Sequence, residues 1–192
     1  MLWRTIVTLN AAAHPSRAPN VASPGVLPAL LIAFIAADTL AGAWFFQLVL
    51  DIRPCPLCLE QRYAYYLAVP LGLALAFAAS RRAPQPVLLA GFAVLLLAAL
   101  ANAWLGGYHA GVEWQFWQGP TDCSGPVADL GSAGTLLQRL DTVKVIRCDE
   151  VQWRFLGLSL AGYNALISLT LAAIAAWGAL CAKGQGSNSE SQ

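Results

Sequence analysis

The chain has 192 residues, of which 58% are hydrophobic and only 11% are charged, and its formal net charge is +1. Soluble domains carry about a quarter charged residues, so this composition excludes an ordinary soluble protein and indicates an integral membrane protein of one domain. The near-neutral charge points to neither a nucleic acid nor an acidic partner, and two histidines are too few for a histidine-rich metal centre.

Residues 1–25 are weakly apolar and broken by polar residues and prolines, which predicts a cytoplasmic N-terminal tail without a clean signal-peptide cleavage site. The first span is expected at about 26–50, roughly 36 Å long as a helix. It contains Asp38, whose charge would cost a few kcal/mol in a bilayer unless the carboxyl is neutral or paired. A structural carboxyl and a proton-handling group are both open interpretations.

Three further apolar runs predict an all-α membrane protein, an up-down four-helix bundle that occupies residues 26–182. The expected outer segments are a short loop and a long loop, the second with a short helix at 134–140. A Gly/Ser/Asn/Gln-rich tail at 183–192 is expected to be disordered. The later spans are expected at about 63–80, 87–105 and 155–180, and the loops at about 51–62 and 106–154.

Four spans put both termini on one side of the membrane and both loops on the other. Arg81 and Arg82 lie in the short turn between the second and third spans, and short basic loops stay in the cytoplasm. This predicts cytoplasmic termini and loops on the outer side, although Arg53 and Arg62 oppose it. The cysteines favour the same orientation, because four of the five then lie on the oxidising side.

The first loop contains Cys55 and Cys58 at C-x-x-C spacing, and the second contains Cys123 and Cys148. A C-x-x-C pair is typical of a redox disulfide. Cys181 falls at the inner end of the fourth span, where a thiol stays reduced and no role is expected.

The four outer cysteines allow three interpretations. A zinc site is disfavoured because Cys123 and Cys148 do not form a compact pair. Two structural disulfides are possible, and one between Cys123 and Cys148 would contribute about 3.5 kcal/mol, but a Cys55–Cys58 ring is too short to stabilise much. A redox relay uses both pairs and is the preferred interpretation.

Arg62 follows Cys58 by one helical turn, so its guanidinium shares a face with that sulfur. It could lower a thiol pKa and stabilise negative charge on a quinone, the two-electron acceptor of a bilayer. The alternative is an arginine that extends to lipid headgroups.

The segment 54–62 (PCPLCLEQR), the segment 147–159 (RCDEVQWRFLGLS) and the four spans together resemble the bacterial disulfide bond formation protein B (DsbB) family over about residues 27–180. The resemblance implies a protein-disulfide:quinone oxidoreductase of the inner membrane that reoxidises a periplasmic DsbA-type thiol oxidase. Its quinone would be ubiquinone or menaquinone, and no metal is expected.

The resemblance also implies the role of each site residue. Cys123 matches the cysteine that forms a mixed disulfide with DsbA, Cys148 the one that exchanges with Cys55, and Cys58 the one that meets the quinone beside Arg62. His109, at the start of the long loop, resembles a histidine near the quinone; a hydrogen-bonded interfacial histidine is the alternative.

Two other functions stay open. The chain could be a specialised paralogue that serves a dedicated partner oxidase. It could also be a structural or metal-binding membrane protein whose cysteines never cycle.

Overall fold

The computed structural model describes residues 23–120 and 147–190. The N-terminal tail, Cys123 and the helix expected at 134–140 lie outside this part of the chain. Within it, four helices are long and apolar enough to cross a membrane, which confirms the all-α four-helix membrane bundle. They are α2 (Val26–Leu48), α3 (Pro56–Ser80), α4 (Gln85–Glu113) and α6 (Leu160–Glu190), whose apolar span is Leu160–Gly184.

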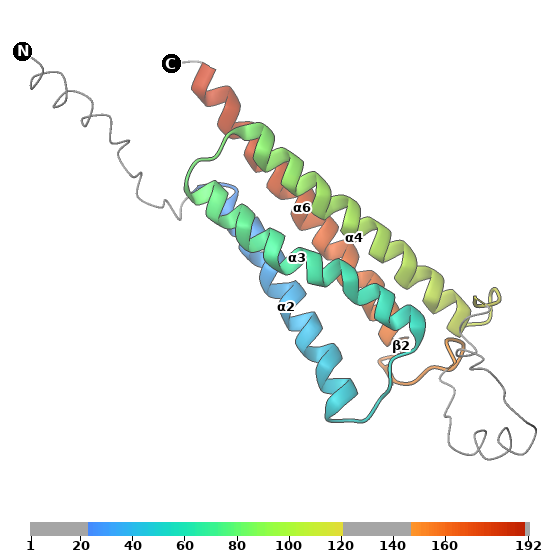
Figure 1. Cartoon of the computed structure of the whole chain (residues 1–192). Coiled ribbons are helices and arrows are strands. Elements are labelled where there is room, and N and C mark those ends of the chain that lie inside the picture. Colours follow the sequence, from blue (N-terminus) through green and yellow to red (C-terminus); the bar gives the residue numbers. More distant parts are fainter. Residues whose placement is uncertain (1–22, 121–146, 191–192) are drawn as a thin grey trace, which may run out of the picture.

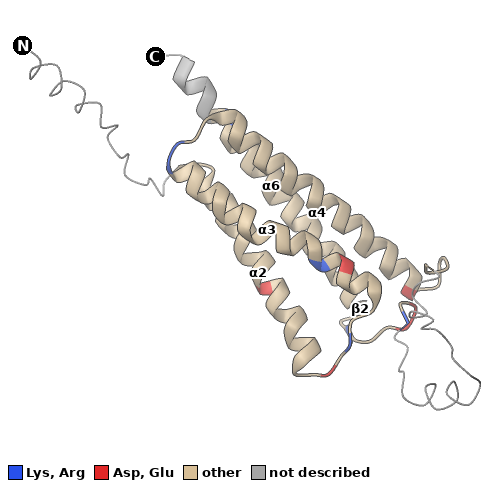
Figure 2. Cartoon of the chain, in the orientation of Figure 1, with Lys and Arg blue, Asp and Glu red and all other residues tan. Residues whose placement is uncertain are grey.

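The helices alternate in direction, so the α3–α4 turn lies at one end of the bundle and the α2–α3 connection and β2 lie at the other (Figure 1). The most extensive contacts join α4 to α6 and α2 to α3. Charged residues lie mainly near the helix ends, and the middle of the bundle has few of them (Figure 2). The exception in α2 is Asp38, its only charged residue.

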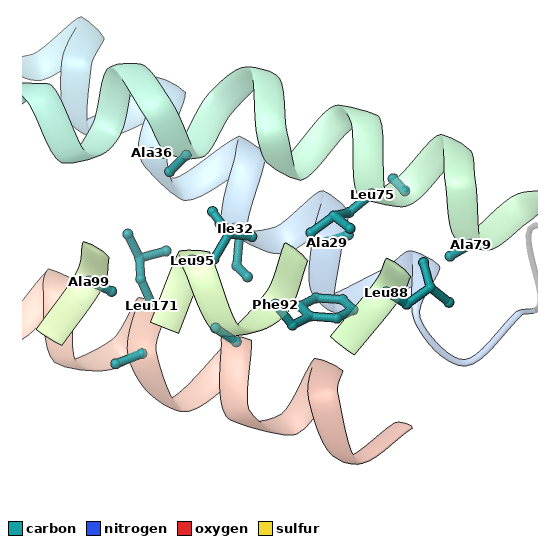
Figure 3. Packing of buried hydrophobic residues seen from close by; sticks show 14 of the residues in the cluster. Ala29, Ile32, Ala36, Leu75, Ala79, Leu88, Phe92, Leu95, Ala99 and Leu171 are labelled. Atoms are coloured by element: carbon teal, nitrogen blue, oxygen red, sulfur yellow. The ribbon is translucent and has the colours of Figure 1, made fainter. Parts of the chain in front are cut away.

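Small side chains let the helices approach one another closely around a few large ones (Figure 3). Phe92 of α4 is fully buried, and a Cβ atom added at Gly178 of α6 would lie 2.3 Å from its ring. Close packing of this kind is how helices associate in a bilayer, where the solvent is as apolar as the core. Labelled residues of this core include Ala29, Ile32, Ala36, Leu75, Ala79, Leu88, Leu95 and Ala99.

A polar cluster also joins three helices inside the bundle. Asn102 Nδ2 of α4 donates to Ser168 Oγ of α6 at 2.9 Å, and Tyr65 Oη of α3 lies 3.2 Å from the same oxygen. Asn164 completes the cluster by accepting from both Tyr65 and Asn102. Because apolar surroundings offer no other partners, these bonds fix how the helices are rotated.

Two helices are longer than the sequence predicted at the end that carries the cysteines. α3 begins at Pro56 rather than near Tyr63, because proline is pre-organised for a first helical position and Cys55 Sγ accepts from the Cys58 amide at 3.3 Å. α4 continues through Gly106, where the sequence predicted the end of the span. This glycine does not end the helix; it allows α4 to lie close to α6. A Cβ atom there would lie 2.9 Å from the Ala165 nitrogen of α6.

The fourth span starts later than predicted, at Leu160, because a small hairpin precedes it. β1 (Arg154–Phe155) pairs with β2 (Leu158–Ser159) in antiparallel register. Leu156 and Gly157 between them both have positive φ, +49° and +85°, as a two-residue hairpin turn requires. The Ser159 hydroxyl then accepts from the Gly162 amide at 3.2 Å and so begins α6.

The C-terminal tail was expected to be disordered from Lys183 onward, and this expectation is wrong in part. α6 continues as a helix to Glu190. The apolar span supplies a stable nucleus, and extending an existing helix costs much less than starting one, even through Gly and Ser.

Candidate redox site

The C-x-x-C pair lies at the beginning of α3. Cys55 caps the helix, is 2% exposed, and its Sγ lies 2.9 Å from Cys58 Sγ. Both cysteines are free thiols in this structure. The helical turn therefore holds the two sulfurs close enough to form a disulfide with little backbone movement.

His109 of α4 contacts this pair from the neighbouring helix. Its Nε2 lies 3.6 Å from Cys55 Sγ, and its Nδ1 lies 3.0 Å from Gln61 Nε2. Both His109 and Gln61 are buried. His109 was expected near the quinone at the start of the long loop; in the structure it lies inside α4 and contacts a cysteine directly. Gln61, which orients the imidazole, was missed from the sequence because a glutamine has no distinctive signal there.

Cys148 returns from the second loop to the same place. Its sulfur, Cys55 Sγ and a nitrogen of His109 all lie within 4.8 Å of one another. Cys148 is 1% exposed and packs with Leu57 and Val112. It is disulfide-bonded, and the other described cysteines are free thiols. Cys55 and Cys148 are therefore neighbours in space, although 93 positions separate them in the sequence.

The surroundings of Cys55 favour its thiolate. The hydrogen bond with Cys58 is the largest influence, and His109 adds a further hydrogen bond and a charge interaction. Together they outweigh burial and lower the pKa of Cys55 from 9.0 to about 5. A thiolate at neutral pH is the form that exchanges with disulfides.

Arg62 lies one turn further along α3 and points toward α2. Its Nη1 donates to Gln47 Oε1 at 2.7 Å and its Nη2 to the Ala43 carbonyl at 3.4 Å. The guanidinium also lies 5.5 Å from the centre of the Trp44 ring. These three contacts fix the charge between α2 and α3. The sequence predicted neither Gln47 nor Trp44 as a contact of Arg62.

A cavity of about 420 Å³ connects these groups. Cys55, Cys58, Arg62 and His109 all line it, and it extends along α2 as far as Asp38. Aromatic rings form part of its wall: Phe46 and Trp153 have centroids 5.0 Å apart, and Trp153 stacks on Phe155 at 5.8 Å. An apolar cavity with a few convergent polar groups is the usual form of a small-molecule site.

The cluster of Cys55, His109 and Cys148 offers one nitrogen and two sulfurs, a donor set that zinc accepts. The disulfide at Cys148 removes one thiolate ligand. The metal-binding interpretation therefore requires the reduced chain. Cys181 lies away from this site, near the end where Gln85 donates to the Lys183 carbonyl.

Comparison with known proteins places this geometry in context. The family model described as "Disulfide bond formation protein DsbB" matches residues 26–178. The chain is also similar to proteins from several bacteria that are named "Disulfide bond formation protein B". The one from Hahella chejuensis is 33% identical over 156 residues, covering 76% of this chain and 90% of its own length. The one from Methylococcus capsulatus is 31% identical over 162 residues, covering 78% and 92%.

The lowered pKa of Cys55 predicts how the reduced protein reacts with iodoacetamide. The alkylation rate at Cys55, followed by peptide mass spectrometry, should rise with pH through a midpoint near 5, because only the thiolate reacts. Cys58→Ala removes the largest stabilising contact and should move the midpoint toward 9. Cys181, alkylated in the same samples, is the internal reference; a Cys55 midpoint equal to that of Cys181 would contradict the prediction.

Proposed function

Because the chain belongs to the disulfide bond formation protein B family, we propose that it reoxidises a periplasmic DsbA-type thiol oxidase by passing two electrons through its two cysteine pairs to a membrane quinone. Family membership and the four spans make it a multi-pass protein of the bacterial inner membrane that acts in disulfide bond formation. The quinone, the partner and the order of electron transfer are the proposed part.

One observation carries the proposal. Cys148 of the second loop lies within 4.8 Å of Cys55, beside a cavity that also contains Cys58. A purely structural disulfide in the loop would have no reason to contact the free thiols of α3. A relay requires this contact, because each thiol–disulfide exchange needs an attacking sulfur next to the disulfide that it opens.

The relay proceeds in four thiol–disulfide exchanges. A thiolate of the partner attacks at Cys123 and releases Cys148, and Cys148 then attacks the Cys55–Cys58 disulfide at Cys55 and releases Cys58. The partner's second thiolate opens its mixed disulfide and releases Cys123. Cys123 then attacks Cys148, which restores the Cys123–Cys148 disulfide and leaves Cys55 and Cys58 reduced. Cys58 lines the cavity, so the two electrons arrive where an acceptor can bind. A DsbA-type oxidant has a potential of about −120 mV, so the acceptor must be more oxidising or the protein must bias the intermediates.

The residues of the cavity fit a quinone. Its volume and aromatic wall suit a flat ring, and Arg62 can donate to a ring oxygen from the position that Gln47 and Ala43 hold. His109 reaches the same space from α4. When bound, a quinone supplies a two-electron, two-proton acceptor. Arg62 would stabilise the negative charge that reduction places on its oxygen.

Two other functions are compatible with the fold. A specialised paralogue would use the same residues with a dedicated partner oxidase. A metal-binding protein would use Cys55, His109 and Cys148 as ligands. About one zinc bound per reduced chain, with no quinone reduction, would favour the metal-binding protein.

The proposal predicts that purified protein reduces added ubiquinone or menaquinone when it is given a reduced DsbA-type partner. Cys123→Ser or Cys148→Ser should abolish this coupled activity, while a small dithiol should still drive quinone reduction at Cys55–Cys58. Cys181→Ser is the matched control and should be neutral. Full coupled activity in the Cys123→Ser/Cys148→Ser protein would show that the loop pair is only structural.

Substitution of Arg62 should lower quinone turnover more than it lowers the amount of folded protein. Arg62→Met should lower quinone turnover by about 10- to 1000-fold, the scale of losing one such electrostatic contact. Arg62→Lys should recover part of the loss, because the charge remains while the planar fork is lost. The measurement is steady-state quinone reduction normalised to correctly inserted protein. Unchanged turnover and KM in Arg62→Met would remove Arg62 from the site.

The proposed relay requires the cysteine end of the bundle to face the periplasm and both termini to be cytoplasmic, as the Arg81-Arg82 turn indicates. A membrane-impermeant thiol reagent applied to reduced spheroplasts should label Cys123 and spare Cys181. The opposite pattern, Cys181 labelled and Cys123 spared, would reverse the orientation.

A further inference from the structure

Glu113 is the last residue of α4 and lies one helical turn beyond His109 on the same face. Its side chain is half-buried and lines the cavity that also contains Cys58. One carboxyl oxygen, Oε2, is buried without a hydrogen-bond partner. Buried polar atoms are nearly always paired, and an unpaired one beside a redox pair often has a chemical role.

The position of Glu113 in its helix does not favour a carboxylate. A carboxylate at the C-terminal end of a helix is unfavourable, because the helix dipole is negative there. Among the residues that the structure describes, no cation pairs with Glu113, and the ion pair in this region joins Arg147 to Asp149. The Ser159 hydroxyl forms a hydrogen bond with the Glu113 carboxyl, and His109, Cys55 and Arg154 act on it electrostatically. Glu113 in turn acts on Cys58.

Reoxidation of the α3 pair requires a proton to leave Cys58. With Cys55 already a thiolate, the reaction is Cys55–S⁻ + Cys58–SH + quinone + H⁺ → Cys55–S–S–Cys58 + quinol. Two electrons leave the sulfurs, one proton leaves Cys58, and the second proton comes from water. The Cys58 proton needs an acceptor as the disulfide closes, and a group that lines the same cavity can take it.

We propose that Glu113 is this acceptor: its carboxylate takes the Cys58 proton as the pair closes and then passes it to the reduced acceptor in the same cavity. Oε2 is free to bind the proton because no other group occupies it. Cys58 and Glu113 line one continuous cavity, within which the proton can pass from the sulfur to the carboxylate. The final transfer rests on the quinone reduction proposed above; the loss of the Cys58 proton does not.

The test measures the reaction of Cys55 and the reaction of Cys58 as two separate steps. In full-length protein carrying Cys123→Ser and Cys148→Ser, the reduced α3 pair is mixed with cystamine, a small soluble disulfide. Cys55 attacks first and forms a mixed disulfide, and Cys58 then loses its proton and closes the ring. With Glu113→Gln, the first step should keep its rate while the second slows about 100-fold, the scale of general base catalysis. The Cys55 mixed disulfide should therefore accumulate in mass spectra.

The controls distinguish proton transfer from a simple charge effect. Neutralising Glu113 removes a negative charge near Cys58, so a purely electrostatic role would make ring closure faster. Glu113→Asp should recover part of the rate. Glu60→Gln, a matched change at an exposed residue of α3, should change neither step. Ring closure in Glu113→Gln that is unchanged or faster would overturn the proposal.

Quinone turnover is measured separately on the same variant of the otherwise unchanged chain. A kcat lowered about 100-fold with little change in KM supports the complete path. If the unsubstituted protein reduces no quinone, the proposed function fails, and the cystamine experiment still decides the role of Glu113.

Discussion

Three side chains from three separate segments meet within 4.8 Å: Cys55 before α3, His109 in α4 and Cys148 after the second loop. His109 and Cys58 hold Cys55 as a thiolate, and a thiolate is the form in which it exchanges with a neighbouring sulfur. In the proposed relay, this meeting point is what joins the two cysteine pairs.

The bilayer determines how this meeting point can be built. Backbone polar groups in lipid must be paired internally, which the four helices achieve. Close contacts at glycine and alanine set the spacing of the helices. Polar bonds among Tyr65, Asn102 and Ser168 fix their rotation. The hairpin of β1 and β2 precedes α6 at the same end of the bundle, and Cys148, a few residues before it, lies next to Cys55 at the start of α3.

The sequence was sufficient to predict the four spans, because apolar length alone identifies a membrane helix. It also identified the C-x-x-C pair and Arg62. It could not locate Gln61, Gln47 or Glu113 as parts of the site, because one polar residue near a helix end has no signal until a second helix is placed beside it. Cys148 was assigned through family resemblance, since no spacing in one sequence shows that two loops converge.

The convergence of Cys55 and Cys148 is the central claim, and trapping tests it directly. In a Cys58→Ala/Cys123→Ala protein, these two cysteines lose the partners that the proposed relay assigns to them. After mild oxidation in membranes, peptide mapping should find a Cys55–Cys148 disulfide in most molecules, with Cys181 still a thiol. Recovery of Cys55 and Cys148 as separate thiols under the same oxidation would contradict the account.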